Sequence, residues 1–515
     1  MLLSGCGARF RGSSAPRQGT FTLADITAPG RLSRTGGALN LDVELNLGGS
    51  TLDIGAATFG TGGLSQVNGT LKNGTIVSGD GTPLTLADNK HNLDGITIGS
   101  NLTVLGHAGI WGGLNLANGV TVDKGSYTWY FNGANSGQPS GTVHHIASLG
   151  TSAIKSSGGN IHIYATNQTL QIDQGVTIQG FVYFGQNWGG NTLINAGTLD
   201  ANVPNQSLSV GTTNFINAST GLMKANGGIM APGGNWSNQG LISVTSGTLS
   251  LQGTFTQADI AAPGRLSRTG GAVNLDTTLN LGGGTLDIGS ATFGVGGLSS
   301  VNGVLKNGTI ISGDGTVLKF ADSRQNLNGI TIGSNLTVQG QAWVWGGLTL
   351  ADGVTVNKGS YNWYFNGYES QLPAGTVHRL SSLGSSVLNS TGGNVIIYAS
   401  NGQTLQIDSG ITIQGYVGVV QNWSGNSIIN AGTLDATVPG QWLSVSASNF
   451  TNASTGVLKA SGGLLAISGT WSNQGLISMT AGSLSLQGTF TLADITGAGR
   501  LSRTGGTVSL DTKIG

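Results

Sequence analysis

The stretch Gly247-Thr248-Leu249-Ser250-Leu251-Gln252-Gly253-Thr254-Phe255 alternates apolar and small polar residues. Leu249, Leu251 and Phe255 fall on odd positions, whereas hydroxyl and amide side chains occupy the even positions between them. A period of two that is broken by glycine is typical of β-strands with one buried face, joined by turns. Because helical spacing appears nowhere convincingly, the sequence predicts an all-β fold.

Short motifs that begin with asparagine recur at the spacing of solenoid coils. Asn195, Asn217 and Asn238 each precede a short apolar strand, and they lie 22 and 21 residues apart. The same spacings recur at Asn430, Asn452 and Asn473. Coils of 21–22 residues stack into a parallel β-helix, so we predict a right-handed β-solenoid of about 24 coils. Asparagines at equivalent corners are expected to form side-chain hydrogen-bond ladders.

The motif Gly-Arg-Leu-Ser-Arg-Thr-Gly-Gly reveals a second and longer period. It occupies residues 30–37, 264–271 and 499–506, at offsets of 234 and then 235 residues, and one extra residue near Gly402 explains the difference. The resulting divisions are an atypical N-terminal lead (1–18), a first solenoid repeat (19–252), a second (253–487) and the truncated start of a third (488–515). Irregular stretches at 133–141 and 367–375 are expected to be loops at equivalent heights.

The composition argues against several classes of function. Glycine makes up 91 of the 515 residues, only 8% are charged, and 21 basic residues balance 21 acidic ones. Since this leaves no electrostatic footprint for a polyanion, no nucleic-acid partner is expected. No apolar stretch approaches the roughly 20 residues of a membrane-spanning helix. The single cysteine, Cys6, excludes an intrachain disulfide framework.

The two ends of the sequence raise expectations about the complete protein. Leu3-Ser4-Gly5-Cys6 resembles the end of a bacterial lipoprotein signal, although the basic and apolar regions of an export signal are absent. Residues 509–515 stop partway through a repeat without a polar cap. We therefore expect a fragment of a longer protein, and the uncapped ends predict end-to-end or lateral self-association.

The coil texture resembles a known group of secreted proteins. The stretches 236–242 (Trp-Ser-Asn-Gln-Gly-Leu-Ile) and 471–477, which has the same sequence, are similar to coils in bacterial autotransporter passengers and filamentous-haemagglutinin-type adhesins. The resemblance covers nearly the whole chain. It implies a right-handed β-helix at the bacterial cell surface or outside the cell, serving in adhesion or as a stalk. It assigns no individual functional residues.

Acidic residues are the candidates for catalysis. A parallel β-helix can carry polysaccharide lyase or glycoside hydrolase chemistry through clustered carboxylates, which is the alternative function. Asp80 and Asp314, both within Ser-Gly-Asp-Gly-Thr, are the best placed, but their flanking glycines favour a turn in which Asp caps backbone N–H groups. The sequence has two glutamates and no Asp-x-Asp pair. No catalytic, cofactor-binding or metal-binding residue is therefore predicted.

Two basic features also recur between the copies. His144 and His378 are the one corresponding pair among the six histidines, and without a cluster of ligands at metal spacing they are expected to be surface or loop residues. Arg31 and Arg34 lie three apart, which directs them to opposite strand faces. We expect them to pair with Asp25, Asp42 and the equivalents of these residues, and anionic-glycan binding is the alternative.

Aromatic runs are the strongest candidates for a binding surface. Each run places three rings on one face of a strand and a fourth on the other. The three rings are Tyr127, Trp129 and Phe131 in the first copy, and Tyr361, Trp363 and Phe365 in the second. An exposed strip would stack on sugar rings, whereas a buried strip would fill the solenoid. Trp188 and Trp423 also recur and fit either arrangement.

These features together predict a structural or adhesive segment of a bacterial cell-surface or secreted protein. It would act as a stiff stalk that binds surface glycans or host or matrix polymers weakly and repeatedly. No cofactor is expected.

Overall fold

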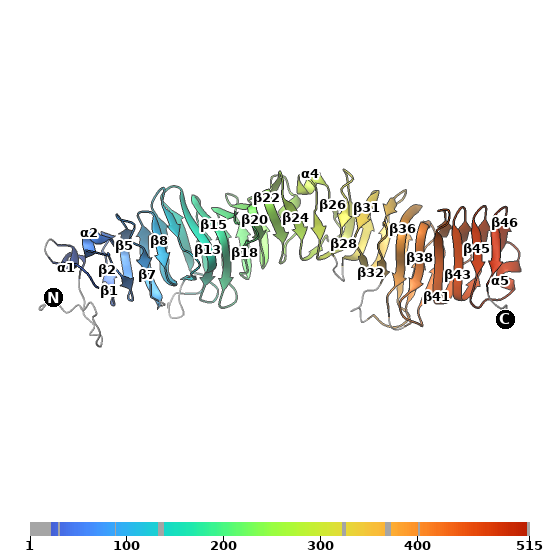
Figure 1. Cartoon of the computed structure of the whole chain (residues 1–515), viewed down its shortest axis with the longest axis horizontal. Coiled ribbons are helices and arrows are strands. Elements are labelled where there is room, and N and C mark those ends of the chain that lie inside the picture. Colours follow the sequence, from blue (N-terminus) through green and yellow to red (C-terminus); the bar gives the residue numbers. More distant parts are fainter. Residues whose placement is uncertain are drawn as a thin grey trace. The chain divides into compact units, whose positions relative to one another are not determined.

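The computed structural model describes residues 22–28, 31–87, 89–131, 139–321, 326–365, 372–399 and 402–511. They form a β-solenoid of about 20 turns with about 23 residues per coil, which confirms the predicted stack of parallel strands. Its handedness stays a prediction. The chain divides into two compact units, Met1–Ala272 and Val273–Gly515 (Figure 1). The repeat limits after residues 252 and 487 describe the sequence period and also stay predictions. Cys6 and the N-terminal lead lie outside the described residues.

The elements of the first unit are α1 (Leu23–Thr27), β1 (Asn40–Leu41), β2 (Leu45–Asn46), β3 (Thr51–Asp53), α2 (Ala56–Phe59), β4 (Gln66–Val67), β5 (Leu71–Val77), β6 (Leu84–Thr85), β7 (Asn89–Ile98), β8 (Leu102–Leu105), β9 (Ala108–Leu116), β10 (Thr121–Asp123), β11 (Trp129–Phe131), β12 (Val143–Ser148), β13 (Ser152–Ile163), β14 (Thr169–Ile172), β15 (Val176–Gln186), β16 (Thr192–Asn195), β17 (Thr198–Ala201), β18 (Ser207–Val210), β19 (Asn214–Asn217), β20 (Leu222–Ala231), β21 (Asn235–Asn238), β22 (Leu241–Leu251), α3 (Ala258–Ala261) and β23 (Leu266–Arg268).

The elements that follow are β24 (Ala272–Leu275), β25 (Thr278–Asn280), β26 (Thr285–Asp287), α4 (Ser290–Phe293), β27 (Ser300–Val301), β28 (Val304–Ile311), β29 (Leu318–Lys319), β30 (Leu327–Ile332), β31 (Leu336–Gln339), β32 (Ala342–Leu350), β33 (Thr355–Asn357), β34 (Trp363–Phe365), β35 (Val377–Ser382), β36 (Ser386–Ile397), β37 (Thr404–Ile407), β38 (Ile411–Gln421), β39 (Ser427–Asn430), β40 (Thr433–Ala436), β41 (Trp442–Asn452), β42 (Val457–Ala460), β43 (Leu464–Asn473), β44 (Leu476–Met479), β45 (Ser483–Leu486), α5 (Ala493–Thr496), β46 (Leu501–Arg503) and β47 (Thr507–Leu510).

Alternating side chains build the core of each unit. In β15, Val176, Ile178 and Val182 are at most 1% exposed, and the polar residues between them face outward. Each strand pairs in parallel with its equivalent in the next coil, as Ile154 does with Ile178. Burying one such aliphatic side chain contributes about 1.5–3 kcal/mol, so a continuous inner row holds successive coils together.

The asparagine corners form the predicted ladders. Asn195, Asn217 and Asn238 are register partners in β16, β19 and β21. Asn195 Nδ2 donates to Asn217 Oδ1 at 2.8 Å, and Asn217 Nδ2 donates to Asn238 Oδ1 at 2.8 Å. The second unit repeats the pattern at Asn430, Asn452 and Asn473, with distances of 2.9 and 2.8 Å. The ladder prediction is therefore confirmed in both units.

Coil length varies more than the sequence spacing suggested. Stacked partners lie 20 residues apart between Leu102 and Val122 and 32 apart between Val122 and Ile154. The predicted coil length of 21–22 residues holds at the asparagine ladder, whereas the average coil has about 23 residues. The predicted number of about 24 coils therefore exceeds the observed number of about 20 turns. The longest coils contain the stretches expected to be loops. Within these stretches, residues 133–138 and 367–371 lie outside the described residues.

One glycine shows why the corners use this residue. Gly180 has φ of +103°, a backbone conformation that other residues adopt at a cost. A Cβ there would also collide with the carbonyl oxygen of Ser156 in the coil below. Gly415 has φ of +102° and the same relation to Ser390 in the second unit. The close stacking of coils thus requires glycine here.

Five helical turns among the described residues depart from the predicted all-strand pattern. Each of α1 to α5 is four or five residues long, so none spans enough sequence to show a helical period. An Asp whose carboxylate accepts N–H groups marks the start of several: Asp259 Oδ2 accepts the Thr256 N–H at 2.8 Å, and Asp494 Oδ2 accepts the Thr491 N–H at 2.8 Å. Thr-x-x-Asp is the sequence signal that could have revealed them. No helix within the described residues is long and apolar enough to cross a membrane.

Candidate functional site

The predicted aromatic strips lie mainly inside the solenoid. Trp129, Phe131, Trp363 and Phe365 are at most 1% exposed. Tyr127 and Tyr361 precede β11 and β34 and are half-buried. The four buried rings cannot present a face to a sugar in solvent, so they are excluded as stacking residues. For these four, the other interpretation, that the strip fills the core, is what the structure shows.

Register explains how such large rings fit inside. Trp129 pairs with Ala108 in the preceding coil and with Ile161 in the next. Trp363 pairs with Ala342 and Val395 in the same way. The small alanine in the neighbouring coil is consistent with the space that an indole needs, and the same pairing recurs in both units.

The opposite face of these strands carries an aromatic row that the sequence prediction did not choose. In the first unit His107, Tyr130, His162 and Tyr183 follow one another across successive coils, and we call them the outer aromatic row. Their ring centroids lie 6.4, 6.0 and 6.2 Å apart in that order. The first three are half-buried, whereas Tyr183 is 39% exposed. Tyr130 also contacts Tyr164 edge to face at 5.8 Å.

The second unit has a tighter version of this feature. Trp343 stacks on Tyr364 with ring centroids 4.2 Å apart, and both rings contact Tyr398. Trp343 is only 8% exposed because its neighbours cover it. The row also stops early, because Ile396 replaces His162 and Gly418 replaces Tyr183. The row therefore extends over more coils in the first unit than in the second.

Two exposed tryptophans occupy equivalent corners. Trp188 follows β15 and is 60% exposed, and Trp423 follows β38 and is 49% exposed. The sequence left open whether they join a stacking surface or the core. The structure places both indoles at the surface.

The recurring histidines were predicted wrongly. His144 and His378 are 3% and 2% exposed, and each ring Nε2 lies within hydrogen-bond distance of a glutamine Oε1: 3.2 Å to Gln168 and 2.6 Å to Gln403. Burial lowers the pKa of both imidazoles, which favours the neutral form, and the glutamine hydrogen bond opposes the shift. The alternation of side chains along a strand could have revealed the burial of His144, since residues two apart face the same side and Ile146 faces inward.

The best acidic candidates serve as caps, as their turn motif predicted. Asp80 Oδ2 accepts the Ala56 N–H at 2.8 Å and Oδ1 accepts the Thr82 N–H at 3.0 Å. These hydrogen bonds, that from Ala56 first, lower the pKa of Asp80 to about 2. Asp314 caps Ser290 and Thr316 in the same way, and its pKa is lowered also. Among the residues that the structure describes, no group of three His, Cys, Asp or Glu side chains could hold a metal ion.

Replacing Asp80 by alanine is expected to loosen α2 without unfolding the first unit. The variant leaves the Ala56 and Thr82 N–H groups without their acceptor, so amide exchange there should become faster. In the native chain the Asp80 carboxylate is ionised and caps fully at any pH above the pKa that it has in the unfolded chain. The cap is lost as the pH falls through the folded-state pKa of about 2, so the exchange should become faster there. Glu44→Ala removes an exposed carboxylate as a control. Unchanged exchange at Ala56 would contradict the capping role.

The arginines of the octapeptide motif contact backbone carbonyls. Arg34 donates to the carbonyls of Gly37 and Gly63, and Arg503 donates to that of Gly506. Asp42, expected as an arginine partner, accepts a hydrogen bond from Asn68. Attraction by Arg31 does help to lower the pKa of Asp25, after the larger effect of hydrogen bonds from Thr22. Arg31 thus acts on Asp25 as a nearby charge, and Arg34 contacts corner carbonyls instead of Asp42.

Two buried lysines were missed altogether. Lys124 and Lys358 are 0% exposed, and each ammonium donates to two backbone carbonyls. Lys124 Nζ lies 2.6 Å from Tyr127 O and 2.7 Å from Gly158 O, and the distances at Lys358 are 2.7 and 2.6 Å. Burial lowers the pKa of both lysines to about 8. Lys124 lies two residues after the inward-facing Val122, so both side chains are on the same face of the chain, and the second copy repeats this spacing. This was the sequence signal that could have revealed the buried lysines.

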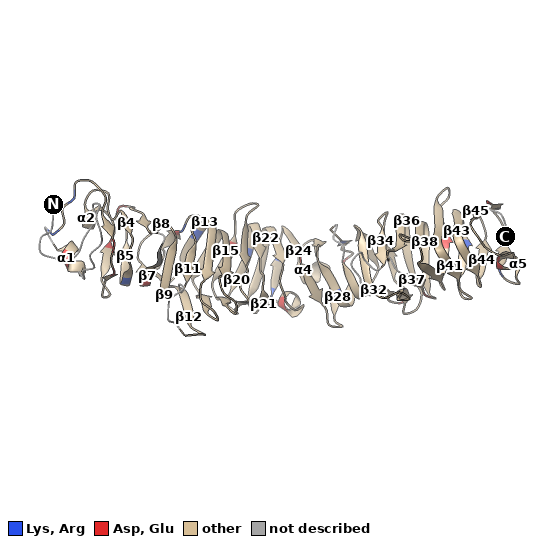
Figure 2. Cartoon of the chain, turned by 90° about the horizontal axis from the view of Figure 1, so that it is seen from below, with Lys and Arg blue, Asp and Glu red and all other residues tan. Residues whose placement is uncertain are grey.

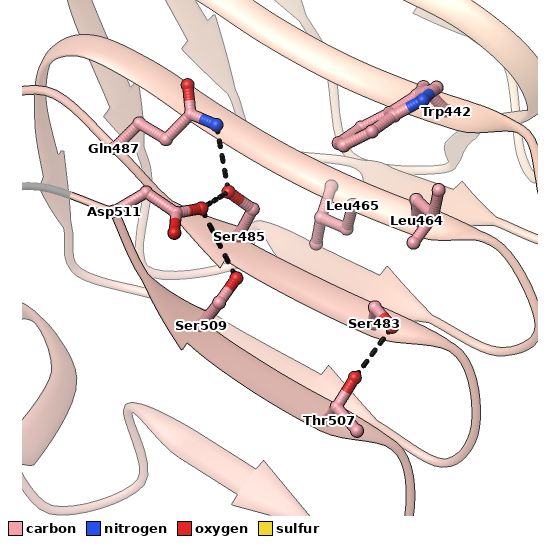
Figure 3. A pocket seen from close by; sticks show the side chains of 9 residues that line it. All are labelled: Trp442, Leu464, Leu465, Ser483, Ser485, Gln487, Thr507, Ser509 and Asp511. Atoms are coloured by element: carbon pink, nitrogen blue, oxygen red, sulfur yellow. Dashed lines mark hydrogen bonds between the residues drawn. The ribbon is translucent and has the colours of Figure 1, made fainter.

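A surface hollow of about 240 Å³ lies on the last described coils of the second unit (Figure 3). Trp442, Leu464 and Leu465 form its apolar side. On the other side, Asp511 accepts a hydrogen bond from Ser485, whose hydroxyl accepts one from the Gln487 amide at 2.9 Å. The hydrogen bonds of this network join its members to one another, and the lining contains a single carboxylate.

No protein-family model matches the chain, and no curated protein matches its sequence.

Proposed function

We propose that the chain is a structural and adhesive segment of a bacterial cell-surface or secreted protein, in which a solenoid scaffold presents aromatic side chains that bind glycans weakly and repeatedly. The outer aromatic row carries the proposal. Its rings project from paired strands, so little side-chain entropy remains to be lost when a ligand binds. Rings on successive coils also offer several contacts to one polymer chain, which raises the total affinity through multivalency.

The scaffold suits this role because its cohesion does not depend on charge. Buried aliphatic rows, strand pairing and asparagine ladders hold the coils, and charged residues are sparse along the ribbon (Figure 2). A protein of this kind tolerates changes in ionic strength, because salt screens surface ion pairs far more than apolar packing. The similarity of its coils to autotransporter passengers and filamentous-haemagglutinin-type adhesins supports a location outside the cell.

The enzyme alternative has no specific observation in its favour. Asp80 and Asp314 use both carboxylate oxygens to cap backbone N–H groups, and the hydrogen bonds that lower their pKa favour the ionised form. A general acid requires the opposite shift.

A glycan array probed with the whole chain tests the proposal. We expect binding to a subset of glycans without release of shortened products. Tyr130→Ala combined with His162→Ala should weaken that binding about tenfold, since each lost ring contact is worth about 0.5–1.5 kcal/mol. Leu149→Ala removes an apolar side chain that is 79% exposed at another corner, and it should bind as the native chain does. Absence of binding, or release of products from a polysaccharide, would overturn the proposal.

A further inference from the structure

The exposed tryptophans Trp188 and Trp423 stand on corners that are built alike. Asn191 and Asn426 are both 0% exposed, and each directs its side-chain Nδ2 at the tryptophan carbonyl, 2.8 Å from Trp188 O and 3.0 Å from Trp423 O. Each asparagine Oδ1 accepts a backbone N–H from the coil below, at 2.7 Å from Gln168 and 2.9 Å from Gln403. A fully buried side chain thus fixes the backbone of each exposed indole.

A second set of contacts fixes the remaining side of the corner. In the first unit, Gly190 N–H donates to Thr213 Oγ1 at 3.0 Å, and the Gln186 amide donates to the same oxygen at 2.8 Å. In the second unit, Ser448 Oγ receives the equivalent donors, Gly425 N–H and the Gln421 amide. Each corner is therefore tied to the coils on both sides, and a ligand that contacts the indole need not order the loop first.

The surroundings of both corners carry no charge. The stretches 160–168, 183–191 and 207–215 occupy neighbouring coils around Trp188, and none contains Asp, Glu, Lys or Arg. The equivalent described stretches around Trp423, 394–399, 402–403, 417–426 and 442–450, also lack these residues. Asparagine, glutamine and threonine supply the polar groups instead. A flat apolar ring among uncharged hydrogen-bonding groups complements a neutral sugar rather than an anion or a cation.

The two corners differ in the placement of their neighbouring rings. In the first unit Tyr183 lies across two glycines, since a Cβ at Gly185 or Gly211 would collide with it. Gly418 takes its place in the second unit. Tyr183 and Trp188 are five residues apart, so their Cα atoms lie at most about 17 Å from each other, a span that a short oligosaccharide can cover. In the second unit the nearest exposed ring on the same strand is Tyr416, seven residues before Trp423, and Trp442 is exposed on the next coil.

We infer that the Trp188 corner, together with Tyr183 at the end of the outer aromatic row, is a ligand site of the chain and takes a neutral oligosaccharide. The inference rests on the proposed glycan-binding function and specifies its site and its ligand class. Trp188 supplies the stacking face and Tyr183 supplies a second ring. The amide side chains of the corner form hydrogen bonds with the hydroxyl groups of the sugar. Asn191 positions the indole through the backbone.

The test compares matched variants of the whole chain. Neutral hexasaccharides of glucose and of N-acetylglucosamine, and an anionic hexagalacturonate, are titrated by calorimetry at low and high salt. We expect at least one neutral hexasaccharide to bind, with an affinity that changes less than about twofold with salt. Trp188→Ala should weaken binding about tenfold and Tyr183→Ala about fivefold, whereas Trp423→Ala, the matched corner, should change it less than about twofold.

The possible outcomes separate the site from the general function. Because Trp188 is exposed, its alanine variant should keep the native melting temperature, and Trp188→Phe should recover part of the affinity. Equal losses in the Trp188 and Trp423 variants, or salt-sensitive binding of the anionic sugar alone, would overturn this inference and leave the adhesive function standing. Failure of the native chain to bind any glycan would overturn both the inference and the proposed function. Binding of a protein through Trp188 in place of a sugar would overturn the ligand class.

Discussion

Asn238→Ala is expected to lower the free energy of unfolding of the first unit by about 3 kcal/mol. The Asn238 side chain accepts hydrogen bonds from Asn217 Nδ2 at 2.8 Å and Gly240 N–H at 3.1 Å. It also donates to the carbonyls of Asp259 and Arg265, at 2.9 and 3.3 Å. Asn238 is 3% exposed, so removing its side chain leaves these groups buried without a hydrogen-bond partner. Each unsatisfied buried group costs about 1–3 kcal/mol. Urea unfolding followed by tryptophan fluorescence measures the loss.

The same strand provides the control. Asn235 lies three residues earlier in β21 and is exposed, so Asn235→Ala should change the unfolding free energy by less than about 0.5 kcal/mol. Asn473→Ala should reproduce the loss in the second unit, because Asn473 makes the same contacts with Asp494 and Arg500. If Asn238→Ala and Asn235→Ala were equally stable, the asparagine ladder would not contribute to cohesion.

These ladders were predictable from the sequence because their physical cause is local and repeated. A corner asparagine must meet its equivalent one coil away, so a spacing of 21 or 22 residues fixes the contact between Asn195 and Asn217. The strand pattern was equally readable, since the inner positions are aliphatic and the outer ones polar. Coil length was harder to predict. Corners absorb insertions without disturbing the strands that they join, and the pair Val122 and Ile154 keeps register across 32 residues.

The face of the aromatic strips could not be read from the sequence. Trp129, Tyr130 and Phe131 put aromatic rings on both sides of β11, so no polar residue marks the outer face. Burial of Trp129 depends on Ala108 in the preceding coil, a contact that only the register reveals. The sequence therefore could not show which rings of these strands are buried, and the outer aromatic row depends on contacts between coils.

The buried lysines should make the stability of each unit rise between about pH 8 and pH 10.5. Burial lowers the folded-state pKa of Lys124 to about 8 from the ordinary lysine value of 10.5, so the unfolded chain binds more protons in this interval. Stability then increases with pH, and the penalty for burying the ammonium is complete below about pH 8. A shift of this size corresponds to about 3 kcal/mol for the lysine. Unfolding free energies measured at pH 7.5 and at pH 10.5 give the difference.

Lys124→Met removes the titrating group, so the first unit of this variant should lose that rise of about 3 kcal/mol. Lys155→Met is the control, because Lys155 is exposed and lies opposite Asp123 in the next coil. It should keep the native pH dependence. Lys358→Met should flatten the curve of the second unit, where the pKa is again about 8 and the two carbonyl contacts recur. If the Lys124→Met variant kept the native pH dependence, the titration of Lys124 would not be the cause of the rise in stability. The ammonium of the native chain would then be solvated rather than buried.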